Sequence, residues 1–106
     1  MLFEFVESVA FTRAAARYLD DESYVQLQAA LNSKPDAGVV IPGSGGLRKL
    51  RWARDGGGKR GGLRVIYYVL LSGGQIWLLA LYSKSVQESI PANVLKTLKE
   101  EIDNAR

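Results

Sequence analysis

Two residue types that carry much of protein chemistry, cysteine and histidine, are missing from this chain of 106 residues. Without cysteine the protein has no disulfide and no thiolate metal ligand. Without histidine it lacks the commonest general base and the commonest metal ligand. A serine–histidine–aspartate triad is therefore excluded, and no metal site or cofactor is expected.

Long hydrophobic runs are also missing. The longest one, Val65–Leu71, is far shorter than the roughly 20 residues of a transmembrane helix. The first residues, Met1–Glu4, show no basic region followed by an apolar stretch and so do not resemble a signal peptide. We expect a cytoplasmic protein that does not bind membranes.

What remains is ordinary for a small globular protein, with 47% hydrophobic and 24% charged residues in one expected domain, residues 1–106. A short strand is predicted at Phe3–Phe5, followed by two helices that Ser8 and Asp20–Asp21 can cap. The last helix should begin near Ser89, with Pro91 in its first turn. Its apolar stripe consists of Val94, Leu95, Leu98 and Ile102.

Three strands are predicted in the middle of the chain, at Leu47–Arg54, Leu63–Leu71 and Ile76–Tyr82. Asp55–Gly62 joins the first two, and Ser72–Gly74 forms the turn between the last two because glycine accepts positive φ. Residues 36–46 are loop-like. This order predicts an α+β fold, in which an N-terminal helical hairpin packs on a small, mainly antiparallel β-sheet with a C-terminal helix.

The net charge of +3 is concentrated in one segment, Leu47–Arg64, which holds seven basic residues and one acid. The basic residues are Arg48, Lys49, Arg51, Arg54, Lys59, Arg60 and Arg64. A positive charge of this density is a candidate anion-binding site. The alternative, which the sequence leaves open, is an ordinary solvated polar face.

Strand alternation places Lys49 and Arg51 opposite Leu50 and Trp52, and the latter pair is the natural core face. Lys49 and Arg51 are therefore expected on the accessible face. The segment holds no pair of carboxylates, which argues against a two-metal nuclease.

In the next strand Arg64 shares a face with Tyr68, and in the last strand Tyr82 continues the face of Leu78 and Ala80. If these faces coincide, five residues converge on one groove: Lys49, Arg51, Arg64, Tyr82 and Lys84. Such a groove suits a polyanion, because guanidinium groups clamp phosphate oxygens and tyrosine rings stack on bases.

The loop Asp55–Gly62 could also be interpreted as a phosphate-cradling loop. It does not match a Walker A motif, because Lys59 is followed by Arg60 and a strand, not by Ser or Thr and a helix. We interpret it as a hairpin that presents Lys59 and Arg60 to nucleic acid.

Two segments, Gly46–Arg54 (GLRKLRWAR) and Gly58–Tyr68 (GKRGGLRVIYY), carry a family signature. Together they resemble the RelE/HigB-type toxins of type II toxin–antitoxin systems, and within that superfamily the HigB branch. The resemblance covers nearly the whole chain in order. It implies a microbial-RNase-like fold and a metal-independent endoribonuclease that cleaves translated mRNA in the ribosomal A site through the 2′-hydroxyl.

The resemblance also implies roles for individual residues. Lys49 matches the position that acts as, or supports, the general base, and Arg51 is the second member of that basic pair. Arg64 matches the arginine that stabilises the phosphorane-like transition state. Lys84 lies where many relatives have an arginine that assists the leaving group, and Tyr82 orients or stacks the substrate. No tyrosine follows Tyr82, although the RelE branch often uses one near its C-terminus, so the acid–base assignment stays open.

Further residues are expected to bind RNA: Arg48, Arg54, Lys59, Arg60 and Tyr68. The partners that the resemblance implies are the ribosome, mRNA and a cognate antitoxin, in this branch a HigA-like helix–turn–helix protein. Two alternatives remain. One is a non-catalytic inhibitor that binds RNA or the ribosome, and the other is a degenerate toxin that binds only its antitoxin.

Overall fold

The computed structural model describes residues 2–53, 62–87 and 89–105. The elements are β1 (Glu4–Glu7), α1 (Val9–Tyr18), α2 (Asp21–Ser33), β2 (Val39–Val40), β3 (Arg48–Trp52), β4 (Leu63–Leu70), β5 (Gln75–Ser83) and α3 (Ala92–Ala105). The strands form one sheet in the order β1-β5-β4-β3-β2. β1 runs parallel to β5, and the other neighbouring pairs are antiparallel.

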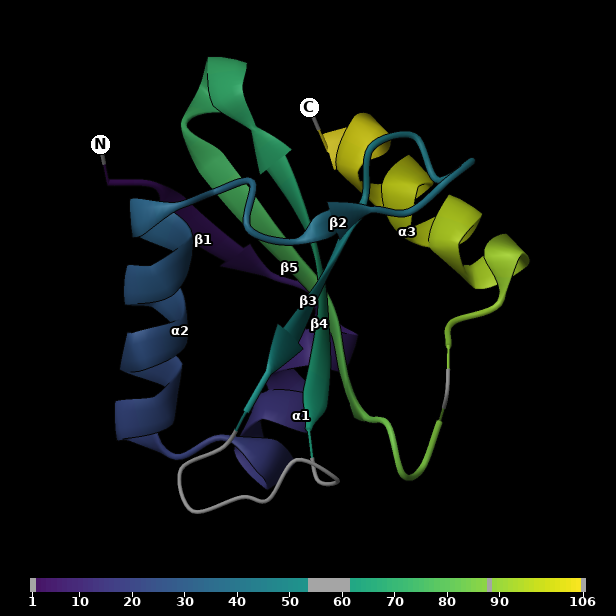
Figure 1. The fold of residues 1–106 in the computed structure, drawn as a ribbon. Coiled ribbons are helices and arrows are strands. Elements are labelled where there is room, and N and C mark those ends of the chain that lie inside the picture. The colour runs from purple at the N-terminus through teal and green to yellow at the C-terminus, as the bar shows by residue number, and fades with distance from the viewer. Residues whose placement is uncertain (1, 54–61, 88, 106) are drawn as a thin grey trace.

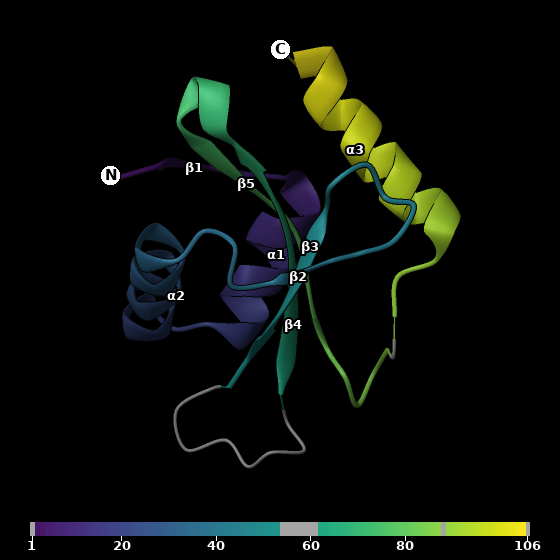
Figure 2. The same ribbon diagram turned by 45° about the horizontal axis from the view of Figure 1, so that its top comes forward.

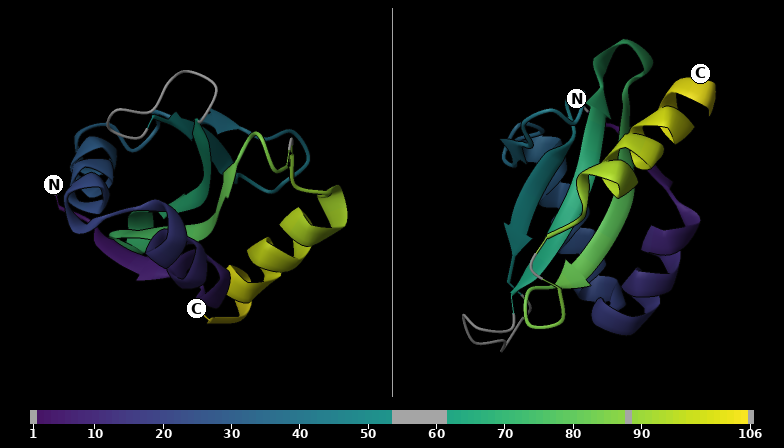
Figure 3. Two further views of the ribbon diagram at one scale, coloured as in Figure 1. Left: turned by 90° about the horizontal axis from the view of Figure 1, so that it is seen from below. Right: turned by 90° about the vertical axis from the view of Figure 1, so that its right-hand side faces the viewer.

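The helices cover both faces of this sheet: α1 and α2 lie on one side, and α3 lies on the other (Figures 1 and 3). This arrangement confirms the predicted α+β fold with its N-terminal helical hairpin and C-terminal helix. No described helix has the length and hydropathy needed to cross a membrane.

The helix starts follow from local side chains. Ser8 Oγ accepts a hydrogen bond from the Phe11 amide at 2.9 Å, and an Asp20 carboxylate oxygen accepts one from the Ser23 amide at 2.7 Å. Both caps are confirmed as predicted. Pro91 lies just before α3 and not in its first turn, and its carbonyl accepts from the amide of Leu95 at 3.1 Å.

A hydrophobic core fills the space between the sheet and the first two helices. Phe11 of α1 and Leu27 and Leu31 of α2 are fully buried there against β4 and β5. Leu50 and Trp52 pack against this cluster, so the core face predicted for β3 is confirmed.

A second cluster lies under α3. Figure 2 shows this helix on the side of the sheet away from α2. The helical part of the cluster consists of Leu95, Leu98 and Ile102, as the apolar stripe predicts, whereas Val94 is 39% exposed at the edge. Ile66 and Tyr82 of the sheet lie in the same cluster. Tyr82 is thus enclosed by the C-terminal helix.

A β-bulge in β5 changes which residues face α3. Ile66 of β4 pairs with Ala80, but the next residue, Tyr67, pairs with Leu78, so Leu79 has no partner in β4. Leu78 lies in the cluster under α1 and α2, whereas Leu79 and Ala80 lie in the one under α3. The prediction that Leu78 shares a face with Tyr82 is therefore wrong, because the extra residue reverses the alternation.

The connections differ in detail from the predicted loops. The turn between β4 and β5 is a single turn of 3₁₀-helix at Leu71–Gly73, closed by Gly74 at φ 64°. Residues 36–46 were expected to be a loop, yet Val39 and Val40 form the short edge strand β2, which pairs with Lys49 and Arg48.

Candidate functional site

Three of the predicted site residues lie in one row across the sheet. Arg51 of β3 pairs with Arg64 of β4, and Arg64 pairs with Tyr82 of β5. Side chains of directly opposed residues lie on the same face, with Cβ atoms about 5 Å apart. This cationic row (Arg51, Arg64 and Tyr82) faces the side of α3, as expected from the alternation in each strand.

The two lysines lie beside this row. Lys49 pairs with Ile66, which pairs with Ala80, so it lies in the neighbouring row on the same face. Lys84 follows directly after β5, where its backbone amide donates to the Gly62 carbonyl at 3.2 Å and its side chain is exposed.

Arg64 is the buried member of the cationic row, with 8% of its surface exposed, whereas Arg51 is exposed. Its Nη1 donates to the carbonyl of Leu63 at 3.3 Å. Among the described residues no carboxylate lies within ion-pair distance of Arg64. The ion pair in this part of the chain joins Lys99 and Asp103 and does not involve Arg64. A buried cation without an anionic partner is costly, so the position suits an anionic ligand.

Tyr82 adds a second buried polar group. Its hydroxyl is inaccessible and has no hydrogen-bond partner in the described part of the chain. Burial raises the pKa of Tyr82, and the positive charge of Arg64 opposes this rise only in part. The hydroxyl therefore keeps its proton at neutral pH, and it can donate a hydrogen bond to an anion beside Arg64 once the side chains that cover it move aside.

The chemistry available to the cationic row is the binding of a phosphodiester. Two guanidinium groups can contact its oxygens with paired N–H donors, and the neutral tyrosine supplies a further donor. No three His, Cys, Asp or Glu side chains within the described ranges are grouped so that they could hold a metal ion.

Two of the residues expected to bind RNA make contacts within the protein. Arg48 pairs with Tyr67 and thus lies on the opposite face, where its Nη1 donates to the Gly38 carbonyl at 2.7 Å. Tyr68 lies on the α3 side, and the Nζ of Lys99 sits 5.0 Å from the centre of its ring.

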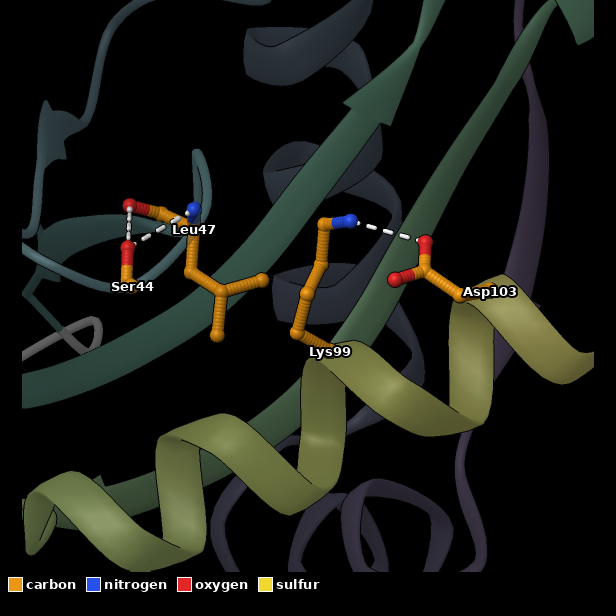
Figure 4. Close-up of polar contacts among 4 residues, drawn as sticks. All are labelled: Ser44, Leu47, Lys99 and Asp103. Atoms are coloured by element: carbon orange, nitrogen blue, oxygen red, sulfur yellow. Dashed lines mark hydrogen bonds and ion pairs between the residues drawn. The ribbon is translucent and has the colours of Figure 1, made fainter.

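Lys99 is itself paired with Asp103 at 2.8 Å, next to the loop that Ser44 holds by accepting a hydrogen bond from the amide of Leu47 at 3.0 Å (Figure 4). Tyr68 is therefore less accessible for base stacking than the sequence suggests. The other predicted RNA-binding residues, Arg54, Lys59 and Arg60, lie outside the described residues.

Sequence reasoning missed a pocket of about 290 Å³ beside Tyr82, between β5 and the beginning of α3. Gln87, Ile90 and Val94 line it together with Tyr82. No local pattern reveals this pocket, because its shape depends on how the chain returns from β5 to α3.

No protein-family model matches the sequence. Several solved chains share its fold, among them two RelE structures. A mutant of the E. coli toxin RelE in the free state is 13% identical, with a TM-score of 0.61 over 93% of this chain and 98% of that chain. A chain of the archaeal RelE–RelB complex from Pyrococcus horikoshii OT3 is 22% identical, with a TM-score of 0.53 over 79% and 97%. The chain therefore has the RelE-like fold.

Proposed function

We propose that this protein is a RelE/HigB-type toxin of a type II toxin–antitoxin system, and that it cleaves translated mRNA in the ribosomal A site. The observation that carries the proposal is the cationic row, in which Arg64 is buried without a described carboxylate partner beside an unpartnered tyrosine hydroxyl. The RelE-like fold supports it, since both similar structures contain RelE toxins.

The proposed reaction is a transesterification within the RNA. The 2′-oxygen attacks the adjacent phosphorus and the bond to the 5′-oxygen breaks, which leaves a 2′,3′-cyclic phosphate and a 5′-hydroxyl. Lys49 accepts or helps to remove the 2′-hydroxyl proton, and Arg51 and Arg64 stabilise the charge that develops on the phosphoryl oxygens. Tyr82 donates a hydrogen bond to the phosphate, and Lys84 assists the leaving oxygen.

The proposed partners are the ribosome, mRNA and an antitoxin of the HigA-like helix–turn–helix type, in the cytoplasm. One of the similar structures is a RelE–RelB complex, which supports an antitoxin partner. The basic segment offers such a partner a target for acidic side chains. In this proposal residues 1–106 act as a single toxin domain.

A non-catalytic inhibitor that binds RNA or the ribosome through the same residues is the second candidate. It is favoured by the lack of histidine in the chain and of any described carboxylate paired with the cationic row. Either group would be a more usual base than Lys49.

Expression of the chain alone, followed by mapping of new mRNA 5′ ends, tests the proposal. We expect growth arrest with in-frame cleavage, and loss of both in Arg64→Ala. Arg17→Ala, which alters an exposed arginine in the last turn of α1, is the matched control and should cleave like the unaltered protein. Circular dichroism checks that both variants are folded.

The other outcomes separate the alternatives. Cleavage that persists in folded Arg64→Ala contradicts the proposed mechanism. Growth arrest without new 5′ ends favours the binding-only inhibitor, and the absence of arrest favours a degenerate toxin that binds only its antitoxin.

A further inference from the structure

The pocket beside Tyr82 lies between β5, the beginning of α1 and the beginning of α3. Its volume of about 290 Å³ leaves room for a small ring system. Side chains that line it include Ala80, Tyr82, Gln87, Ile90, Val94 and Leu98. Most of them are apolar and none of the lining residues is charged. The pocket therefore suits a neutral group and not a phosphate.

Two of the side chains that line this largely apolar pocket are polar, those of Tyr82 and Gln87. The hydroxyl of Tyr82 is buried and has no described partner. Gln87 contributes an amide, whose nitrogen donates to the Ser89 carbonyl at 2.9 Å. A ligand in the pocket would contact the ring of Tyr82 and could form a hydrogen bond with the Gln87 amide.

The open edge of β5 is a third feature of the pocket. β1 pairs with β5 only as far as Glu7, opposite Leu78. Beyond that point, among the described residues, Ala80–Tyr82 have β4 on one side and no strand on the other. Backbone groups on an open strand edge are free to bind a ligand with donors and acceptors at its rim.

A nucleobase combines these requirements, because it has flat apolar faces and a rim of hydrogen-bond donors and acceptors. Its position in an RNA also fits, since Tyr82 belongs both to the pocket and to the cationic row through its pairing with Arg64. A phosphate beside Arg64 and a base in the pocket would be neighbours on one strand of RNA.

We propose that the pocket between β5 and the beginning of α3 binds one unpaired base of the RNA whose phosphate lies at Arg51 and Arg64. The inference rests on the proposed function, and it assigns base recognition to Tyr82, Gln87 and Val94. The pocket selects a base by its rim contacts, whereas the cationic row binds any phosphate.

The test measures binding of two fluorescent probes by anisotropy: a short single-stranded RNA of mixed sequence, and an abasic chain with the same number of phosphates. Val94→Phe fills the pocket from the rim of α3, where Val94 is 39% exposed. It should weaken binding of the RNA about tenfold and leave binding of the abasic chain unchanged. Val25→Phe, at an exposed position of α2, is the matched control and should bind both probes like the unaltered protein.

Arg64→Ala separates the pocket from the proposed function, because it should weaken binding of both probes by a similar factor. Normal binding of both probes by Arg64→Ala, together with weaker binding of the RNA alone by Val94→Phe, would contradict the proposed phosphate site at Arg64 and support the base pocket. If Val94→Phe binds the RNA normally, or the unaltered protein binds RNA no better than the abasic chain, the pocket is only a packing gap between helix and sheet.

Gln87→Ala provides a second variant that removes a polar group without adding volume. Gln87 belongs to neither of the two hydrophobic clusters, so its truncation leaves the core untouched. Weaker binding of the RNA, with unchanged binding of the abasic chain, would support the pocket even if Val94→Phe failed to fold. Unchanged binding of both probes would overturn the role assigned to Gln87 and, with normal Val94→Phe, the pocket itself.

Discussion

Arg64 keeps a positive charge in a buried position for which the described residues supply no carboxylate. Withdrawal of an ion from water costs several kcal/mol, and among the described residues no ion pair offsets that cost. Arg64→Met retains much of the side-chain volume without the charge. We expect it to leave the free energy of unfolding unchanged or to raise it by about 1 kcal/mol in urea denaturation, and to abolish mRNA cleavage.

Arg51→Met is the matched control for this effect, because Arg51 lies in the same row but is exposed. Its free energy of unfolding should change by less than about 0.5 kcal/mol. A loss of more than about 2 kcal/mol in Arg64→Met would contradict the prediction, since it would mean that the guanidinium is well paired in the free protein.

Two tyrosines in neighbouring strands should respond in opposite ways to the same substitution. The Tyr67 hydroxyl accepts from the Gly38 amide at 2.8 Å and donates to the Pro35 carbonyl at 2.7 Å, whereas the Tyr82 hydroxyl has no described partner. Tyr67→Phe should lower the free energy of unfolding by about 2 kcal/mol, because it leaves two backbone groups unsatisfied. Tyr82→Phe should leave it unchanged or raise it by up to about 1 kcal/mol.

Thermal or urea unfolding of both variants checks this contrast. Equal losses of stability would show that the Tyr82 hydroxyl has a partner in the folded protein. A stable Tyr82→Phe that also cleaves mRNA normally would remove Tyr82 from the proposed chemistry.

At the scale of the elements, Ser8 links α1 to the sheet. Its hydroxyl accepts from the Phe11 amide at the start of α1 and donates to the Leu79 carbonyl of β5 at 2.7 Å. We expect Ser8→Ala to lower the free energy of unfolding by about 1 to 2 kcal/mol in urea denaturation. Ser72→Ala, in the exposed turn between β4 and β5, should change it by less than about 0.5 kcal/mol. Equal effects would mean that the cap contributes little.

Features that depend on a few neighbouring residues, such as helix caps, were predictable from the sequence. Features that depend on which strands pair, and in which register, were not. The caps Ser8 and Asp20 and the alternation in β3 act over a few residues, and the structure confirms them. The bulge at Leu79 depends on the register against Ile66 and Tyr67, which no residue type in β5 marks. The strand β2 was missed because its two residues pair only when β3 lies beside them.

At the scale of the whole molecule, the sequence predicts which residues share one face of the sheet in the candidate site. It does not predict how deeply each of these side chains is buried. Alternation within each strand places Arg51, Arg64 and Tyr82 on one face, and the register joins them in a row. The sequence contains no sign that Arg64 is buried and Arg51 exposed, because burial depends on how the neighbouring strands and α3 cover the face. Arg48 belongs to the same basic segment, yet it lies on the opposite face.

Stability at high pH is also a property of the whole chain, because tyrosines from α2, β4 and β5 contribute to it together. Burial is the main cause of the raised pKa of Tyr24, Tyr67 and Tyr82, and for Tyr24 a hydrogen bond to Glu7 raises it further. In the unfolded chain the same groups ionise near the ordinary value of about 10. Above that pH the unfolded state binds fewer protons than the folded state, so the free energy of unfolding must fall as the pH rises.

We therefore expect these groups to cause no pH dependence of the free energy of unfolding near neutral pH, and to make it fall progressively above about pH 10. Urea denaturation at intervals between about pH 8 and pH 12 measures the slope, and the absorbance of tyrosinate reports when the rings ionise. Tyr24→Phe should make the slope shallower even though it also removes the contact with Glu7 and lowers stability at every pH. An identical slope in that variant would show that Tyr24 ionises alike in the folded and unfolded chain, and that its hydrogen bond to Glu7 does not hold its proton.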